Sequence, residues 1–309
     1  MTEQFQIFVV DPDVYNEQES LGTKEKFWFS HEQLGRCLYK KSRSNIAGED
    51  WSEKIAAELC RLLKLPHAEY ELATCNDEYG IISRSFLPEN GNLVLGNEIL
   101  VEIYPDYPED TRDLSQHTVN IIFSTFNWLE IEYSEIFMPL GCEILENISK
   151  AEHVFLGYLL VDAWIGNSDR HHENWGFVEL DRKLYLAPTY DHASSLGRNE
   201  SDKKREARLR TRDKGYAVGA YADKCQSYFY TSIGNRQRIT TFQAFCEAAK
   251  LYPQAADTWL ECLKNISVDD THRLFNCIPE HRISPVAIEF ACGILIHNRD
   301  RLLRFREQL

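Results

Sequence analysis

The hydrophobic pattern of this chain changes character part-way along, and the change limits the folds that it can adopt. Up to about residue 87, apolar residues come mainly in short runs rich in β-branched and aromatic side chains, as in 5–10, 26–30 and 36–41. From about residue 114 they recur at spacings of three and four over longer segments, as in 117–129, 151–166 and 284–305. Runs of the first kind are typical of strands, and the longer spacing is typical of helices. The sequence therefore predicts an α+β fold.

The N-terminal part, residues 1–87, is predicted to be a β-rich lobe with one helix. Its first three runs suggest an antiparallel sheet, and a helical stripe over 48–65 precedes two more strands, 68–73 and 79–86. The remaining residues, 88–309, are predicted to form a larger, mainly helical lobe. A cleft between two such lobes is a common location for ligands.

Composition and charge exclude several classes of protein. With a net charge of −14 over 309 residues, the chain lacks the excess of Lys and Arg that a DNA-wrapping protein needs, so direct DNA binding is not expected. The nine cysteines are scattered and never form C-x-x-C, which indicates reduced thiols rather than a disulfide framework. We found neither a secretory signal nor an apolar run long enough to span a membrane, so we expect a cytoplasmic protein without membrane contact.

One polar stretch, 166–178, stands between an apolar helix and a hairpin predicted over 177–190 that turns at Asp181-Arg182. It contains Asp169 and Asn174, five residues apart, and Asp191 follows at the end of the hairpin. Phosphoryl transfer from ATP requires a carboxylate that orients the acceptor hydroxyl, and oxygen ligands that hold Mg²⁺. Asp169 fits the first requirement, and Asn174 and Asp191 fit the second, because Mg²⁺ prefers carboxylate and amide oxygens.

This stretch has two other possible interpretations. A single Asp and Asn on a loop more often cap a helix or a turn than take part in catalysis. His171, His172 and Glu173 are potential zinc ligands of a hydrolase, but adjacent histidines point apart on regular backbone and no H-E-x-x-H is present. The order of Asp169, Asn174 and Asp191 favours phosphoryl transfer over both.

The same residues resemble a known family, the HipA-like serine/threonine kinases, which are distant kin of the phosphatidylinositol kinases. The similarity runs from about residue 20 to the C-terminus and is carried by "GEDWSEKIAAEL" (48–59), "DAWIGNSDRHHENWGF" (162–177), "LAPTYDHASSLG" (186–197) and "KGYAVGAYADK" (214–224). It implies a bilobal, protein-kinase-like fold that uses ATP and Mg²⁺. Asp169 then corresponds to the catalytic base, Asn174 and Asp191 to the magnesium ligands, and His171 to a residue that braces the loop.

The resemblance places ATP against the N-terminal lobe. Lys40 would neutralise phosphates and Glu53 would pair with it, with Lys41 as the alternative if the strand register differs by one residue. The phosphate-covering loop would lie in 20–29, and the hinge that meets adenine in 83–88. These two segments contribute the candidate nucleotide-binding residues Gly22, Thr23, Lys24, Arg84, Ser85 and Phe86.

The resemblance also implies partners. The substrate would be a protein with a Ser or Thr acceptor, the protein would be a toxin held by an antitoxin, and Ser20 or Thr23 would be autophosphorylated. The basic run 203–214 is either a solvated face or a strip that holds an acidic substrate such as an RNA-associated protein. Two alternatives stay open: a lipid or small-molecule kinase of the phosphatidylinositol-kinase type, and a nucleotide-binding module without catalysis.

Overall fold

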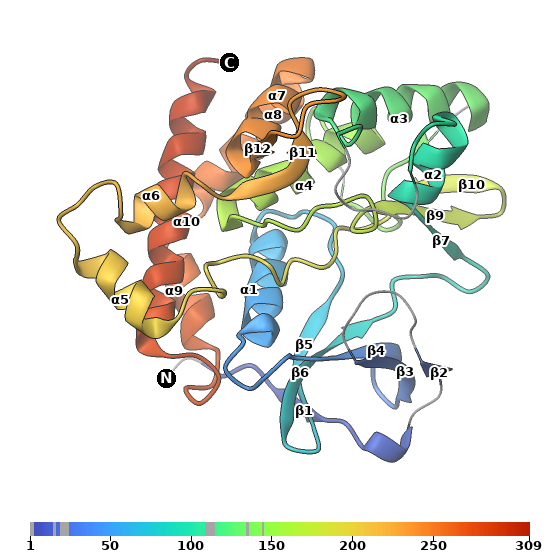
Figure 1. The fold of residues 1–309 in the computed structure, drawn as a ribbon. Helices are drawn as coiled ribbons and strands as arrows, with labels where there is room; N and C mark the ends of the chain where they lie inside the picture. The colour runs from blue at the N-terminus through green and yellow to red at the C-terminus, as the bar shows by residue number, and fades with distance from the viewer. Residues whose placement is uncertain (1–2, 15–16, 19–24, 109–114, 134–135, 144) are drawn as a thin grey trace.

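The computed structural model describes residues 3–14, 17–18, 25–108, 115–133, 136–143 and 145–309, and Figure 1 shows a six-stranded sheet below a larger helical part. The sheet has the strand order β1-β5-β6-β4-β3-β2, and a short 3-10 helix, Pro12–Val14, precedes β2. Its strands are Ile7–Val9 (β1), Glu17–Gln18 (β2), Lys26–His31 (β3), Gly35–Lys41 (β4), Tyr70–Cys75 (β5) and Glu78–Arg84 (β6).

The strands predicted in the N-terminal part are present, but one of them pairs differently from the prediction. β3, β4, β6 and β5 are antiparallel to one another in turn, whereas β1 pairs in parallel with β5, with Ile7 opposite Leu72. The expectation of an antiparallel partner for 5–10 was therefore wrong. Parallel strands need a long crossover connection, and the chain between β1 and β5 supplies one that includes a helix.

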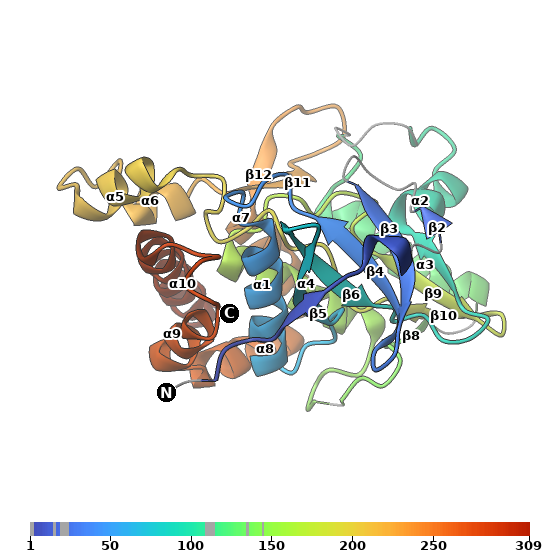
Figure 2. The same cartoon turned by 90° about the horizontal axis from the view of Figure 1, so that it is seen from below.

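Helix α1 (Glu49–Leu62) joins the two parts of the molecule, as Figures 1 and 2 show from two directions. Trp51, Ile55 and Leu59 recur every four residues and are buried in the same hydrophobic core as helices of the larger part. The helix starts after Gly48, whose φ of 68° favours glycine, and a Cβ there would lie 2.5 Å from the indole nitrogen of Trp51. The two parts therefore share one core, and α1 is fixed within it.

The larger part is built around α4, in which every residue except His153 is buried. Helices α3, α7, α8 and α10 pack around it. None of the helices in the described ranges is both long and apolar enough to cross a bilayer. The helices are Gly96–Ile103 (α2), Val119–Tyr133 (α3), Ala151–Ile165 (α4), Asp202–Arg210 (α5), Val218–Ala222 (α6), Thr241–Leu251 (α7), Pro253–Asn265 (α8), Val268–Asn276 (α9) and Pro285–Arg306 (α10).

Two small sheets complete this part. One has the order β7-β9-β10-β8, and the other pairs β11 with β12. The predicted hairpin is present as β9 and β10, and its turn residues Asp181 and Arg182 have φ values of 52° and 61°, as a type I′ turn requires. The strands are Asn92–Leu95 (β7), Ile136–Phe137 (β8), Gly176–Leu180 (β9), Lys183–Leu186 (β10), Gln226–Tyr230 (β11) and Arg238–Thr240 (β12).

Candidate active site

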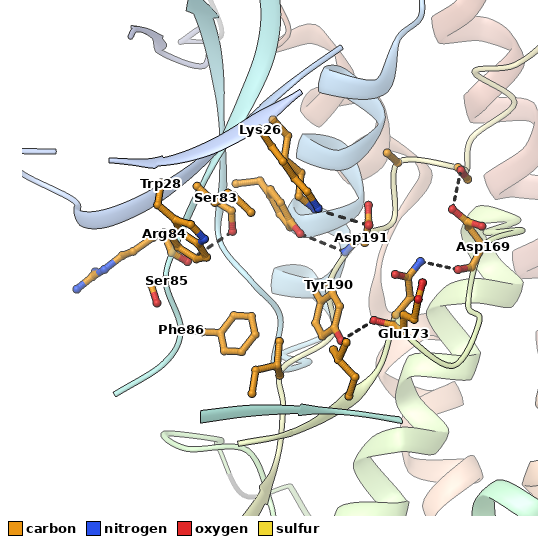
Figure 3. Close-up of a pocket in the computed structure, with 18 of the residues that line it drawn as sticks. Lys26, Trp28, Ser83, Arg84, Ser85, Phe86, Asp169, Glu173, Tyr190 and Asp191 are labelled. Carbon is orange, nitrogen blue, oxygen red and sulfur yellow. Dashed lines mark hydrogen bonds and ion pairs between the residues drawn. The ribbon is translucent and has the colours of Figure 1, made fainter. Parts of the chain in front are cut away.

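A pocket lies between the six-stranded sheet and the loop that follows α4 (Figure 3). Its walls come from β3, β4, β5 and β6, from the segment after β6, and from three segments of the larger part, one of which is β7. Eight of the residues predicted from the sequence line it: Lys40, Arg84, Ser85, Phe86, Asp169, His171, Asn174 and Asp191. The structure therefore brings together groups that lie far apart in the chain.

The lysine side of the pocket follows from strand alternation. On β4, Cys37 and Tyr39 face a small hydrophobic cluster, so Leu38 and Lys40 face the pocket. Lys41 points to the other face, where its ammonium group lies 2.5 Å from Glu78 and 3.3 Å from Glu25. Of the two lysines weighed from the sequence, Lys40 is the one at the pocket.

A second lysine, which the sequence analysis missed, lies on the neighbouring strand. Lys26 of β3 is the cross-strand partner of Lys40, and both line the pocket. Like charges directly opposite each other in a sheet are unfavourable, so this arrangement fits a site for an anion. The available signal was the position of Phe27 and Phe29: these two side chains are buried on the opposite face, so Lys26 and Trp28, which alternate with them, face the pocket.

The loop after α4, which we call the 167–175 loop, is held by a buried ion pair. Both oxygens of Asp162, at the end of α4, accept hydrogen bonds of 2.8 Å from the guanidinium group of Arg170. Arg170 also donates to the carbonyl oxygens of Asn174 and Tyr190, at 2.7 and 3.5 Å. One buried side chain thus fixes the loop and the residue before Asp191. Arg170 lies within the 162–177 motif, but its sequence context alone did not indicate this role.

Asp169 and Asn174 face the pocket from this loop. The side-chain nitrogen of Asn174 donates to the main-chain oxygen of Asp169 at 2.7 Å, so the spacing of five residues closes a tight turn. The carboxylate of Asp169 lies 3.5 Å from the hydroxyl of Ser194 and is about one-third exposed, which leaves it accessible to a ligand. Asp169 is therefore positioned by the backbone and open to the cleft.

His171 lies between two carboxylates on the same loop. Its ring nitrogens are 4.0 Å from Asp169 and 3.6 Å from Glu173, and the ring meets Tyr228 edge to face. The ring is buried, so its contacts tie both ends of the turn to β11. The bracing role of His171 stays a prediction.

The neighbouring His172 has a different environment. It shares a hydrogen bond of 2.9 Å with the hydroxyl of Tyr107, and its ring is turned by 80° from that of His171. Behind it, His117 accepts from the indole of Trp175 and contacts the carbonyl oxygen of Tyr228. Burial lowers the pKa of His117 to about 3, so this ring is neutral. The loop is therefore held by partners from different parts of the chain: Tyr228 meets His171, Tyr107 bonds to His172, and His117 accepts from Trp175.

Asp191 faces Asp169 and Asn174 from the segment after β10. Its backbone is left-handed, with φ of 58°, and its amide donates to the hydroxyl of Tyr70 at 3.1 Å. Burial raises the pKa of Tyr70, which keeps this phenol neutral. The carboxylate of Asp191 lies 3.6 Å from the ammonium group of Lys40. This ion pair connects the two walls of the pocket (Figure 3).

Glu53 has partners other than the predicted one. Its carboxylate accepts hydrogen bonds from the main-chain nitrogens of His192 and Ala193, at 2.6 and 2.9 Å. Among the described residues, Lys40 forms its ion pair with Asp191 rather than with Glu53. The predicted Lys40–Glu53 pair is therefore corrected: the glutamate of α1 holds the backbone just after Asp191, because that segment lies between α1 and the lysine.

A second carboxylate of α1, which the sequence analysis also missed, acts one turn earlier. Glu49 accepts from the amide of Arg43 at 2.8 Å and lies 3.3 Å from the guanidinium group of Arg198. Arg198 donates to the carbonyl oxygen of Ala193 at 2.8 Å. The guanidinium group of Arg43 also lies 3.7 Å from Glu49, and both arginines line the pocket, so Glu49 holds two cations at its edge.

The opposite end of the pocket is apolar and includes the predicted hinge. Phe86 stacks with Tyr190 at 5.9 Å between ring centroids, and Trp28, Leu38 and Leu95 lie nearby in the lining. The amide of Ser85 donates to the carbonyl oxygen of Arg36 at 2.9 Å, which ties the hinge to β4. An apolar slot next to a charged end suits a planar base joined to phosphates.

Two further predictions have different outcomes. Gly22, Thr23 and Lys24, together with Ser20, lie outside the described residues. The basic run 203–214 forms helix α5 and the loop after it, and Figures 1 and 2 show it at the outer edge of the molecule beside α10. Arg205 of this run is buried, whereas Lys203 and Lys204 are exposed. The run is thus partly structural and partly a solvated face.

Comparison with known proteins supports the fold assignment. No protein-family model and no curated protein matches the chain. Among solved structures, the proinflammatory kinase CtkA of Helicobacter pylori matches with a TM-score of 0.73 and 16% identity, covering 98% of this chain and 97% of that chain. HipA of a Shewanella oneidensis MR-1 toxin–antitoxin system, solved with HipB and operator DNA, matches with a TM-score of 0.57 and 12% identity over 95% of this chain and 67% of that chain.

At these identities the likeness shows the fold. The chain has the mixed α+β, kinase-like fold of CtkA and HipA, as the sequence analysis predicted. The prediction that it resembles HipA-like proteins is confirmed at that level.

Proposed function

We propose that the protein is an ATP- and Mg²⁺-dependent kinase that phosphorylates Ser or Thr residues of a protein substrate. One observation carries the proposal: Asp169, Asn174 and Asp191, from two segments, line the same pocket as Lys40, which forms an ion pair with Asp191 across it. Phosphoryl transfer depends mainly on positioning and on charge neutralisation, and these groups supply both.

Asp169 is the group that orients the acceptor. Its carboxylate faces the cleft, and the backbone bond to Asn174 fixes its position. A hydroxyl placed there would donate to Asp169, which would accept the proton as the hydroxyl oxygen bonds to the γ-phosphorus and the bond to the departing ADP oxygen breaks. The Ser194 hydroxyl, 3.5 Å from the carboxylate, marks a position from which an acceptor oxygen would reach Asp169.

The magnesium ligands would be Asn174 and Asp191. The Asn174 amide nitrogen is engaged with Asp169, which directs the amide oxygen away from that bond, and Asp191 contributes a carboxylate at the pocket wall. Oxygen donors of these two types fit Mg²⁺. When bound, Mg²⁺ neutralises charge on the phosphates.

The phosphates would lie against Lys26 and Lys40, and adenine against the hinge. The lysines project from adjacent strands into the charged end of the pocket, while Phe86 and Tyr190 form the apolar end. The resemblance to HipA-like kinases supports Ser or Thr as acceptor, and the HipB complex of the Shewanella protein supports an antitoxin partner. Autophosphorylation at Ser20 or Thr23 and an RNA-associated substrate are further parts of this proposal.

The test uses purified protein with γ-labelled ATP and Mg²⁺. Acceptors are a casein-like protein, a phosphoinositide and no added substrate. We expect label on protein, and Asp169→Asn should lower transfer by about 10³-fold while nucleotide binding persists. Wild-type transfer in Asp169→Asn would contradict the assigned role. Label on the phosphoinositide alone would replace a protein acceptor with a lipid.

A further inference from the structure

Helix α5 and the loop after it, at the outer edge of the larger part, carry many Lys and Arg residues. Some of these attach the segment to the body of the protein, and the others face solvent. We call residues 202–216 the basic arm. It carries seven Lys and Arg residues against three acidic ones, although the chain as a whole has a net charge of −14. An isolated helix of nine residues is marginal in water, so the arm needs anchors to the body.

The inner face of the arm supplies the anchors. Arg205 donates to the carbonyl oxygens of Gly197 and Arg198, at 3.3 and 2.9 Å. One turn further on, Arg208 forms an ion pair of 3.0 Å with Glu200, and Leu209 packs against the cluster around Phe290 of α10. These residues recur at spacings of three and four, which places them on one side of the helix. Two of the seven cations are thus used for attachment.

The outer face and the loop present the other cations to solvent. Lys203, Lys204, Arg212 and Lys214 are exposed, and in the described part of the chain no carboxylate lies within ion-pair distance of them. Arg210, also exposed, pairs with Glu206 at 2.7 Å. Charges of one sign gathered in this way lower stability by repulsion, and a bound anion would offset that repulsion.

The arm is attached directly to the phosphate-transfer end of the pocket. Arg198, whose carbonyl oxygen is held by Arg205, lines the pocket and binds Ala193, two residues after Asp191. A substrate that reaches Asp169 from the side of the basic arm would therefore pass a cationic surface that is attached to the segment following Asp191.

We infer that the basic arm is a docking surface for acidic or phosphorylated segments of the protein substrate, near its acceptor Ser or Thr. This inference rests on the proposed function and names its substrate class. A short protein segment fits better than a nucleic acid, because the cations without an ion-pair partner among the described residues are four on one short helix and its loop, which matches a short acidic cluster. Binding of a nucleic acid usually neutralises a longer run of phosphates.

The experiment compares two serine peptides that differ only in a neighbouring cluster, which is acidic in one and uncharged in the other. Acidic clusters of Asp and Glu or of phosphoserine are placed at several spacings from the serine. For the wild type we expect kcat/KM on the order of tenfold higher for the acidic peptide, mainly through KM, with an advantage that shrinks as salt increases. In the variant with Lys203, Lys204, Arg212 and Lys214 all changed to Ala, the advantage should disappear while kcat on the neutral peptide is unchanged.

The control variant removes four exposed cations elsewhere: Lys183, Lys250, Lys264 and Arg304 are changed to Ala. It has the same net charge as the arm variant and should keep the wild-type preference. Equal kcat/KM for the two peptides in the wild type, or a preference that survives in the arm variant, would overturn the inference.

Peptide binding measured by fluorescence anisotropy separates this inference from the proposed function. If the wild type transfers phosphate to no peptide, the proposed function fails, and arm-dependent binding of the acidic peptide would still support the docking surface. Arm-dependent binding of a single-stranded RNA, without any preference for the acidic peptide, would show that the arm serves nucleic acid and would overturn the inference.

Discussion

Two buried arginine–aspartate pairs hold different regions of this molecule. In the floor of the cleft, Arg170 binds Asp162 through two bonds of 2.8 Å. Where α1 meets the segment before α10, Arg282 donates to Asp50 at 2.8 Å. All four side chains are almost completely buried. The chemistry is the same, but the backbone that each arginine holds is not.

The difference lies in what else each arginine binds. Arg170 donates to the carbonyl oxygens of Asn174 and Tyr190, which belong to the candidate site. Arg282 donates to the carbonyl oxygen of Ala73 and the hydroxyl of Thr74 in β5, so it fixes α1 against the sheet. It is connected to the site indirectly, through side chains of these two elements such as Glu53 and Tyr70. Equal contributions to stability should therefore have unequal effects on catalysis.

The largest expected effect tests whether the backbone held by Arg170 positions a residue that is needed for phosphate transfer, namely Asp191. Asp191→Asn should lower phosphate transfer by about 10³-fold, because a carboxylate charge facing the phosphates is lost. Nucleotide affinity should become much less dependent on Mg²⁺. Transfer of labelled phosphate and titration of nucleotide binding with and without Mg²⁺ measure the two effects.

Asp181→Asn is the matched control. Asp181 has a similar backbone, with φ of 52° against 58° for Asp191, and it lies in the exposed turn between β9 and β10. Asn is tolerated in this conformation, so both variants should fold. If both, or neither, reduced transfer, Asp191 would lose its assigned role.

The two arginines can then be compared directly. Arg170→Met and Arg282→Met should each lower the free energy of unfolding by about 3–5 kcal/mol, because each leaves a buried carboxylate unpaired. At a temperature where both are folded, kcat should fall by about 10²-fold for Arg170→Met and by less than about tenfold for Arg282→Met, since small displacements at the reacting groups have large effects. Urea unfolding and single-turnover transfer provide the measurements.

Double variants check that the unpaired charge is the cause. Adding Asp162→Leu to Arg170→Met, or Asp50→Leu to Arg282→Met, removes that charge and should recover part of the lost stability in each case. kcat should stay low in the first double variant, because the bonds to Asn174 and Tyr190 are still missing. Equal loss of kcat for both arginine variants would show that the two regions are not functionally distinct.

The same contrast explains which parts of the site could be predicted. Asp169 and Asn174 lie five residues apart on one loop, and their order together with Asp191 was visible in the sequence, as was Arg170 within the quoted motif. Strand alternation predicted that Lys40 leaves the apolar face of its strand, and the same reasoning applied to 26–30 would have found Lys26. The fold class followed from the change in hydrophobic spacing, because a strand places every second residue on one face, whereas a helix places every third or fourth residue on one face.

Contacts between distant segments could not be predicted in this way. Arg282 and Asp50 are 232 residues apart, and no local pattern links them. The partner of Glu53 was predicted by analogy as Lys40, but the packing of α1 against the segment after Asp191 gives it two backbone amides instead. The parallel pairing of β1 also depends on which strands come between it and β3. These three contacts could be identified only once the three-dimensional arrangement of the segments was known.

The smallest expected effect is the pH dependence of stability that arises from His117, the neutral histidine that contacts the 167–175 loop through Trp175. Burial lowers the pKa of His117 to about 3, so the unfolded chain binds a proton below about pH 6.5 that the folded protein does not bind. Stability is therefore lost as the pH falls toward the folded pKa. From pH 8 to pH 5 this histidine should lower the free energy of unfolding by about 2 kcal/mol. Unfolding by urea at several pH values measures the slope.

His117→Gln should be less stable at pH 8 but should have a flatter pH dependence than the wild type. His281→Gln, at an exposed position, should keep the wild-type slope. The 167–175 loop would then be stabilised by two different kinds of contact. Arg170, paired with Asp162, holds it through a charged side chain, and the neutral ring of His117 holds it by accepting a hydrogen bond from Trp175. If His117→Gln kept the full slope, protonation of another group would have to explain it, and the loop would not depend on a neutral His117.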